Sequence, residues 1–146
     1  MTRLDRDLLA ERAMAVGRHL ARVAERLPPD VADFKPATDA SDAVVLHLWQ
    51  ATQVVIDIAT AACVRLSLGT PTSYADAFVR LAGAGVIDAT LATRLSRAAG
   101  FRTVVAHAYE QLDMARVFRA ATEGPADLRT FLAALARTLQ RQVGRD

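Results

Sequence analysis

Apolar side chains recur along this chain with the period of an α-helix. In the first stretch they stand three or four residues apart, which places one apolar stripe along a helix. Its members are Leu9, Ala13, Val16, Leu20, Val23 and Leu27. No stretch of useful length alternates with the period of a β-strand. The sequence therefore predicts an all-α fold, an up-and-down bundle of about five helices joined by short connections.

Strong breaks set the expected helix ends in the first half of the chain. The first helix should run from about Leu4 to Leu27, because Pro28-Pro29 cannot continue it. The segment from Asp30 to Ala40 shows no apolar period and is predicted to be a loop. Ser41-Asp42 can cap the second helix, and a short third helix should follow Ser73.

The second half of the chain contains equally clear signals for where helices begin and end. Asp88 can cap a fourth helix that ends at Gly100, a residue suited to the C′ position. A further helix is expected from about Arg102 to Thr122, with Gly124-Pro125 ending it and Asp127 opening the last helix. The residues expected to face inward in the last four segments are Ala77, Phe78, Leu81, Leu91, Leu95, Ala98, Leu128, Phe131, Leu132, Leu135 and Leu139.

The second helix, which should reach about Leu68, is apolar nearly all round. A helix without a polar face must be surrounded by protein. In a small domain part of that surrounding can come from a second copy, so a homodimer is expected. The helix is not expected to cross a membrane, because polar side chains interrupt its apolar run. They are His47, Gln50, Gln53 and Asp57.

Composition places the chain among globular proteins with one domain, here residues 1–146. Its 146 residues are 52% apolar and 23% charged, which suits a single packed core. The net charge of +2 is too small to indicate nucleic-acid binding by itself, although 17 of the 18 basic residues are arginines. The first residues carry charges and no apolar run, so no secretory signal is predicted and the cytoplasm is the expected location.

Neither disulfide nor metal chemistry is expected. Cys63 is the single cysteine, which excludes an internal disulfide and a cysteine-based zinc cluster. Its apolar surroundings predict a buried, inert thiol. The three histidines, His19, His47 and His107, are far apart in the sequence and form no local metal motif. His47, close to Trp49, is expected in the core or at an interface. No metal and no cofactor are therefore predicted.

One short segment carries groups with catalytic potential. Arg102 is followed after four residues by His107 and then by Tyr109. An imidazole can take a proton from a ribose 2′-hydroxyl near neutral pH. A guanidinium can neutralise charge that builds on a phosphorane-like transition state. A phenol can donate a hydrogen bond or accept a covalent group. The three side chains together suit phosphodiester chemistry.

Helix geometry separates two of these groups. Residues five apart lie ~140° apart around a helix axis, so Arg102 and His107 do not share a narrow face. Either Arg102 stands at a helix start and reaches around, or the site is completed across an interface between subunits. Plainer interpretations stay open as well. His107 can be structural or exposed, Arg102 can be solvated or paired with a carboxylate, and Tyr109 can bond to Asp113 on its own helix.

The segment resembles the signature of the HepT family, toxins of the HEPN superfamily whose shared motif is Arg, four to six residues, then His. The resemblance extends upstream. Ala51 to Ala61 is similar to the family's long second helix, and Gly69 to Phe78, followed by Leu81 and Gly85-Val86-Ile87, is similar to the stretch before the motif. It covers roughly residues 41 to 140.

This resemblance implies a metal-independent endoribonuclease. Arg102 and His107 would be the catalytic pair, in a cleft between two subunits of a helical dimer, and the product would carry a 2′,3′-cyclic phosphate. The implied partner is a minimal nucleotidyltransferase of the MntA type. It would silence the toxin by transferring AMP from ATP to Tyr109. The added nucleotide would put bulk and negative charge where an RNA phosphate must sit.

One residue departs from the family pattern. The residue after the motif arginine is often Asn in the family and here it is Thr103, whose single hydroxyl could weaken an orienting bond to the substrate or to His107. The alternative function is therefore a non-catalytic helical module that binds a nucleotidyltransferase or a nucleotide.

Two further features have open roles. Asp57 lies in a mostly apolar helix and is expected to have a partner, either a core arginine or His107. Arginines make the last third basic and could either be solvated or contact RNA phosphates. They are Arg116, Arg119, Arg129, Arg137, Arg141 and Arg145.

Overall fold

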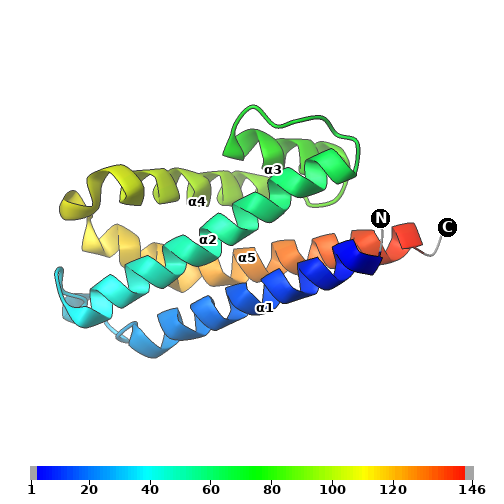
Figure 1. Ribbon diagram of the computed structural model, residues 1–146. Coiled ribbons are helices and arrows are strands. Elements are labelled where there is room, and N and C mark those ends of the chain that lie inside the picture. Colours follow the sequence, from blue (N-terminus) through cyan, green and yellow to red (C-terminus); the bar gives the residue numbers. More distant parts are fainter. Residues whose placement is uncertain (1–2, 144–146) are drawn as a thin grey trace.

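The computed structural model describes residues 3–143, and these form a bundle of α-helices without any strand (Figure 1). This confirms the predicted all-α fold. The helices are α1 (Arg3–Arg26), α2 (Asp39–Arg65), α3 (Tyr74–Gly83), α4 (Ala89–Ala108) and α5 (Met114–Val143). Two short 3-10 helices, η1 (Val31–Asp33) and η2 (Tyr109–Gln111), lie in the connections, so the predicted loop before α2 contains η1.

The central helix of the bundle is α2, which contacts each of the other four α-helices. Figure 1 shows α1 and α5 running along it, while α4 covers one end and α3 the other. The inward-facing residues predicted for α3 and α5 are all buried, and so are Leu91 and Leu95 of α4. Phe78 meets Phe131 edge to face across the core, with ring centroids 5.7 Å apart. The helical apolar period therefore identified the core correctly.

The start of α2 lies earlier than the sequence suggested. Thr38, not Ser41-Asp42, is the N-cap. The Thr38 hydroxyl accepts a hydrogen bond from the Ser41 amide at 3.0 Å, and the Ser41 hydroxyl accepts one from the Thr38 amide at 3.1 Å. This reciprocal capping box satisfies two backbone donors that a helix start leaves free. Ser41 is a functional part of the cap at position N3 rather than the cap itself.

The predicted break at Gly100 is wrong, because α4 continues to Ala108. Only Gly69 and Gly85 have positive φ among the described glycines, so Gly100 does not adopt the left-handed conformation of a C′ residue. A glycine inside a helix costs about 1 kcal/mol relative to alanine. Burial of Ala99 and Val105 on either side offsets this cost. The chain breaks later, where the Asp113 carboxylate accepts a hydrogen bond from the Ala115 amide at the start of α5.

The predicted break at Gly124-Pro125 is also wrong, since α5 runs through both residues. Proline inside a helix loses one backbone hydrogen bond and costs about 3 kcal/mol. Here the apolar stripe continues across the proline, with Val117, Ala121 and Leu128 all buried. Tertiary packing on both sides therefore holds the helix together. The helix expected from about Arg102 to Thr122 is wrong as well, because its first part belongs to α4 and its second part to α5.

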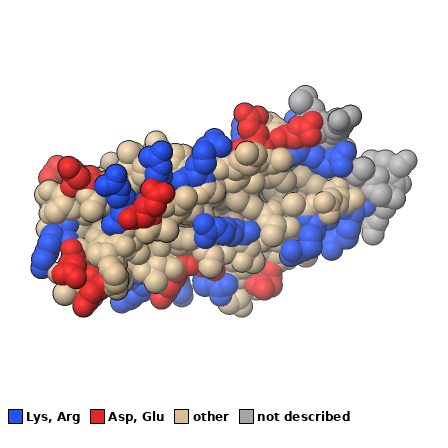
Figure 2. Space-filling model, turned by 90° about the horizontal axis from the view of Figure 1, so that it is seen from below, with Lys and Arg blue, Asp and Glu red and all other residues tan. Residues whose placement is uncertain are grey.

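One helix among the described residues, α2, is long and apolar enough to span a bilayer by length and composition. Half of its most apolar window is buried inside the bundle, as in the core helix of a globular domain. The bundle surface seen from below mixes basic and acidic side chains without a large patch of one sign (Figure 2). Cys63 is fully buried, as predicted, and burial raises the pKa of its thiol.

Candidate functional site

Arg102 lies in the second half of α4 and contacts two aromatic rings from other helices. Its guanidinium carbon is 5.0 Å from the ring centroid of Trp49 on α2 and 5.6 Å from that of Tyr74 on α3. A guanidinium over aromatic rings gains cation–π attraction. We call these three residues the Arg102 stack. Because α4 is continuous, Arg102 does not stand at a helix start, and that alternative is wrong.

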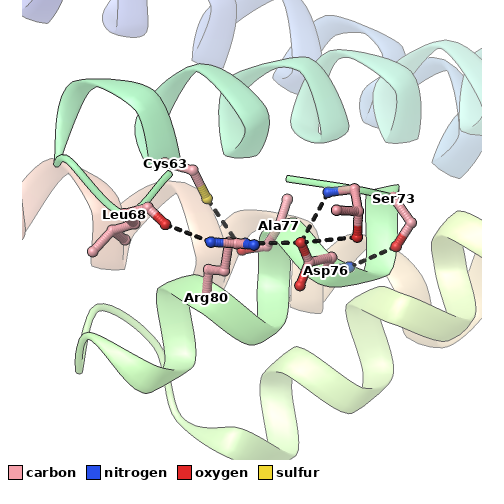
Figure 3. A network of polar contacts seen from close by, with 7 residues as sticks. Cys63, Leu68, Ser73, Asp76, Ala77 and Arg80 are labelled. Atoms are coloured by element: carbon pink, nitrogen blue, oxygen red, sulfur yellow. Dashed lines mark hydrogen bonds and ion pairs between the residues drawn. The ribbon is translucent and has the colours of Figure 1, made fainter. Parts of the chain in front are cut away.

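A network in the connection between α2 and α3 fixes the start of α3, where Tyr74 lies (Figure 3). The Arg80 guanidinium donates to the Leu68 carbonyl at 2.7 Å and to the Asp76 carboxylate at 2.8 Å. Asp76 also accepts from the Thr72 amide at 2.9 Å. The hydrogen bond from Arg80 is the main cause that lowers the pKa of Asp76. The turn before Tyr74 is thus tied to both helices that it joins.

Gly69 allows this network to form. Its φ of +88° lies in the left-handed region that favours glycine. A Cβ atom at this position would stand 2.8 Å from Nη1 of Arg80, so a larger residue would displace the guanidinium. The close approach of backbone and side chain here explains why a glycine occupies the turn.

Polar atoms without a hydrogen-bond partner gather beside the Arg102 stack. Among the described side chains four buried polar atoms lack a partner, and three of them belong to Trp49, Gln53 and Arg102. Trp49 and Gln53 are four residues apart and share a face of α2. An unsatisfied buried polar group costs about 1–3 kcal/mol. This face is therefore suited to contact with a further polar molecule.

Tyr109 follows directly after α4 and points its hydroxyl at α2. The hydroxyl donates a hydrogen bond of 2.6 Å to Asp42, not to Asp113 as one interpretation of the sequence held. This hydrogen bond, with smaller effects of burial and of nearby carboxylates, raises the pKa of Tyr109 to about 12. The phenol is therefore neutral at physiological pH, and its side chain remains accessible at 44% exposure.

His107 and Thr103 face away from these contacts. The His107 side chain is exposed in the last turn of α4. It lies ~140° around the helix from Arg102, so one protomer does not bring the two side chains onto a common face. The Thr103 hydroxyl donates to the Ala99 carbonyl of its own helix at 3.2 Å. A hydroxyl engaged in this way is a poor substitute for a free amide.

The expected roles of Asp57 and His47 are settled by their contacts. Asp57 is exposed and accepts a hydrogen bond from Gln53 at 2.8 Å, so neither a core arginine nor His107 is its partner. Both expected partners of Asp57 are therefore wrong, because the face of α2 that carries it is open. His47 lies 3.0 Å from His19, Nδ1 to Nδ1, between α2 and α1. This half-buried position agrees with a structural histidine.

The C-terminal arginines within the described residues are exposed, and Arg145 lies outside that part of the chain. The exposed ones are Arg116, Arg119, Arg129, Arg137 and Arg141. Among residues 3–143 no group of three His, Cys, Asp or Glu side chains could hold a metal ion.

Sequence reasoning gave no role in the site to Asp42, Trp49, Gln53 or Tyr74. A signal for three of them was present. Asp42, Trp49 and Gln53 are spaced seven and four residues apart, which places them on one face of α2. That face also carries Leu46, whose side chain is 50% exposed. A polar and aromatic stripe on an otherwise apolar helix thus marked the side that meets the motif.

Comparison with known proteins identifies the family. The chain matches the family described as "Ribonuclease HepT-like" over residues 16–135. It is 28% identical over 108 residues to the mRNA nuclease HepT of Shewanella oneidensis, a match that covers 74% of this chain and 80% of that protein.

Solved structures agree with this assignment. The fold matches the tri-AMPylated Shewanella oneidensis HEPN toxin in complex with MNT antitoxin, with a TM-score of 0.80 and 25% identity, over 92% of this chain and 98% of that chain. A crystal structure of a toxin–antitoxin with AMP-PNP also gives a TM-score of 0.80 at 25% identity, over 88% and 97%. The resemblance to the HepT family is thereby confirmed, and the chain belongs to the ribonuclease HepT-like family.

Proposed function

We propose that this protein is an endoribonuclease toxin of a toxin–antitoxin pair, acting in the cytoplasm. The observation that carries the proposal is the position of the motif on α4. Arg102 is held over two rings with its Nε unpaired among the described residues, while His107 is exposed one and a half turns later. The relative named mRNA nuclease HepT supports the same activity.

The chemistry needs one proton acceptor and one phosphate ligand. His107 takes the proton from the ribose 2′-hydroxyl, whose oxygen then forms a bond to the adjacent phosphorus. The bond from phosphorus to the 5′-oxygen breaks, and this oxygen takes a proton from the His107 imidazolium, which leaves a 2′,3′-cyclic phosphate and a 5′-hydroxyl. Arg102 donates to the non-bridging oxygens, where negative charge grows in the transition state. No step requires a group that the chain itself lacks.

The active unit in this proposal is a homodimer. Arg102 and His107 lie on different sides of α4, so a second copy that presents its own motif would complete the site. Unpaired polar atoms of Trp49 and Gln53 and the exposed Leu46 lie on the adjacent face of α2. A face that mixes apolar area with unsatisfied polar groups suits contact with another protein surface.

We also propose that an MntA-type nucleotidyltransferase silences the toxin at Tyr109. The Tyr109 oxygen attacks the α-phosphate of ATP, its bond to phosphorus forms, and pyrophosphate leaves. Asp42, 2.6 Å from the phenol, accepts the proton. The matched toxin is tri-AMPylated and lies in complex with MNT antitoxin, which supports this regulation.

The nuclease is tested by cleavage of RNA with the purified chain in the absence of any partner. His107→Ala should abolish cleavage and growth inhibition, whereas Thr90→Ala, an exposed residue of the same helix, should leave both unchanged. Cleavage is measured by gel electrophoresis, with the cyclic phosphate identified by mass spectrometry. Intact RNA after incubation with the unmodified chain would overturn the nuclease proposal.

Silencing is tested by co-expression with an MntA-type nucleotidyltransferase. Intact mass should show added AMP, and Tyr109→Phe should remove it, while Tyr74→Phe, also an exposed tyrosine, should not. AMP that persists on Tyr109→Phe would contradict the assigned acceptor.

The alternative function is a non-catalytic module that binds a nucleotidyltransferase or a nucleotide. The observation in its favour is Thr103, whose hydroxyl bonds to its own helix rather than toward a substrate. Under this alternative, partner binding survives the double change Arg102→Ala and His107→Ala, and the unmodified chain leaves RNA intact.

A further inference from the structure

A groove lies between α4 and α5, and its lining includes residues of both helices and of α2. Its volume is about 280 Å³. The two walls are antiparallel helices, and Arg94 of α4 bridges them by pairing with Asp127 of α5 at 2.9 Å. This ion pair closes one end of the groove and sets the register of the walls. Phe101 then lies opposite the turn of α5 that carries Arg119.

The open end of the groove is rich in unpaired arginines. Arg116 and Arg119 line it, while Arg97 lies one turn from Arg94; all three side chains are exposed, and none forms an ion pair among the described residues. Glu123 and Asp127 lie toward the closed end. The positive charge is therefore concentrated at the open end. The planar guanidinium group of arginine matches the oxygens of a phosphate group. An arginine without an ion-pair partner is therefore free to bind a phosphate.

The floor of the groove is apolar. Leu48 of α2 lies beneath it, with Phe101 and Leu128 on the two walls. Gly124 lies beside Leu48, where a Cβ atom would stand at an ordinary contact distance of 4.0 Å. Planar bases pack well against such surfaces, and stacking on an aromatic ring does not depend on base identity. The groove thus combines an apolar base site with a phosphate site.

We infer that the α4–α5 groove binds one nucleotide unit, with its phosphate on Arg116 and Arg119 and its base against Phe101. The volume is near the lower end of the range of about 300–1000 Å³ for small-molecule sites, which suits one unit rather than a longer segment. The same chemistry fits a unit of single-stranded RNA and a free mononucleotide. As an RNA contact, it rests on the proposed nuclease function and gives the substrate a second anchor on the motif helix.

The test measures binding to fluorescein-labelled single-stranded oligo(A) by fluorescence anisotropy. All variants carry His107→Ala so that the probe stays intact. The double change Arg116→Glu and Arg119→Glu is compared with Arg137→Glu and Arg141→Glu on the same helix. Both pairs alter the net charge equally, but only the first lines the groove. Circular dichroism confirms that both variants fold.

The groove variant should lose about tenfold or more in affinity, and the slope of log affinity against log salt should fall by about 1.4, or 0.7 for each lost phosphate contact. The control should change affinity by less than about twofold. Equal losses in both variants would overturn the inference. A parallel titration with AMP separates the two sources. Displacement of oligo(A) by AMP indicates a mononucleotide site, and binding of oligo(A) alone indicates an RNA anchor.

Failure of this inference differs from failure of the nuclease proposal. If the unmodified chain cleaves RNA while the groove variant binds oligo(A) as well as the control does, only the inference about the groove is contradicted. If groove-dependent binding is seen but the unmodified chain cleaves nothing, only the nuclease proposal is lost.

Discussion

Arg102 owes its position to residues outside its own motif. Trp49 and Tyr74 come from two other helices, and their rings stand 5.0 and 5.6 Å from the guanidinium carbon. A long arginine side chain loses conformational entropy when it becomes ordered. Because the two rings already hold Arg102 in place, this entropy is not lost again when the substrate reacts. Trp49 is therefore a positioning residue in the proposed nuclease.

At the residue scale we predict that Trp49→Ala lowers the rate of RNA cleavage. Loss of one cation–π contact of about 0.5–2 kcal/mol corresponds to roughly a twofold to thirtyfold decrease in kcat. Trp49→Phe should retain most of the activity because its ring preserves the contact. A decrease confined to KM would contradict the positioning role.

A spectroscopic readout checks the same contact without activity. Trp49 is the chain's only tryptophan, so intrinsic fluorescence reports on it alone. Arg102→Ala should shift its emission to the red, since water then reaches the indole. His107→Ala should leave the spectrum unchanged.

At the scale of elements, tertiary packing overrides local helix-ending signals. Gly100 and Gly124-Pro125 are proper helix-ending signals, yet α4 and α5 run through them because the apolar stripe continues on both sides. Burial of several apolar side chains outweighs a single local penalty of about 1–3 kcal/mol. The break that does occur, before Asp113, has an ordinary capping residue. The sequence thus contained three plausible breaks, and only the packing selects among them.

The continuity of α4 predicts the effect of Gly100→Ala. Nothing lies within 4 Å of a Cβ atom at this helical position, so the change should stabilise the protein by about 0.5–1 kcal/mol. Gly85→Ala is the matched contrast, because Gly85 has a φ of +78° and alanine there should destabilise by about 1 kcal/mol. Thermal unfolding measures both. A destabilised Gly100→Ala variant would indicate that the helix ends there after all.

The contact between α1 and α2 predicts a dependence of stability on pH. Burial lowers the pKa of His19, and His47, Arg18 and Arg22 lower it further. Since the folded pKa lies below the unfolded value of about 6.5, protonation favours unfolding. The contribution of His19 is present above about pH 6.5 and is lost as the pH falls through its lowered folded pKa. His19→Gln should make the melting temperature depend less on pH between pH 7.5 and pH 5. His107→Gln, at an exposed residue, should leave this dependence unchanged.

At the scale of the whole molecule, the sequence specified the bundle better than the site. The helical period placed the core, and the motif pointed to Arg102, His107 and Tyr109 as candidates. The partners of these residues depend on how α2 lies against α4, which no local pattern encodes. Asp42 is 67 residues from Tyr109 in the chain, yet the two share a hydrogen bond of 2.6 Å. Long-range register of this kind requires the three-dimensional structure.

The proposed homodimer gives a prediction at the same scale. Leu46→Arg places a charge on the exposed face of α2 beside the Arg102 stack and should reduce the mass in solution to that of one 15.7 kDa chain. Met14→Arg is the control, because Met14 is equally apolar and 65% exposed on α1. Light scattering after size-exclusion chromatography measures both masses. An unmodified chain that elutes as a monomer would contradict the dimer.

The turn between α2 and α3 lies outside the motif, yet its residues set the position of a ring that contacts the motif arginine. Gly69, Asp76 and Arg80 fix where α3 starts, and α3 starts with the ring that contacts Arg102. A substitution in this turn would shift the Tyr74 ring while the residues of the α4 motif stay the same. In the proposed nuclease, the strength of cleavage therefore depends on a turn that lies outside the motif itself.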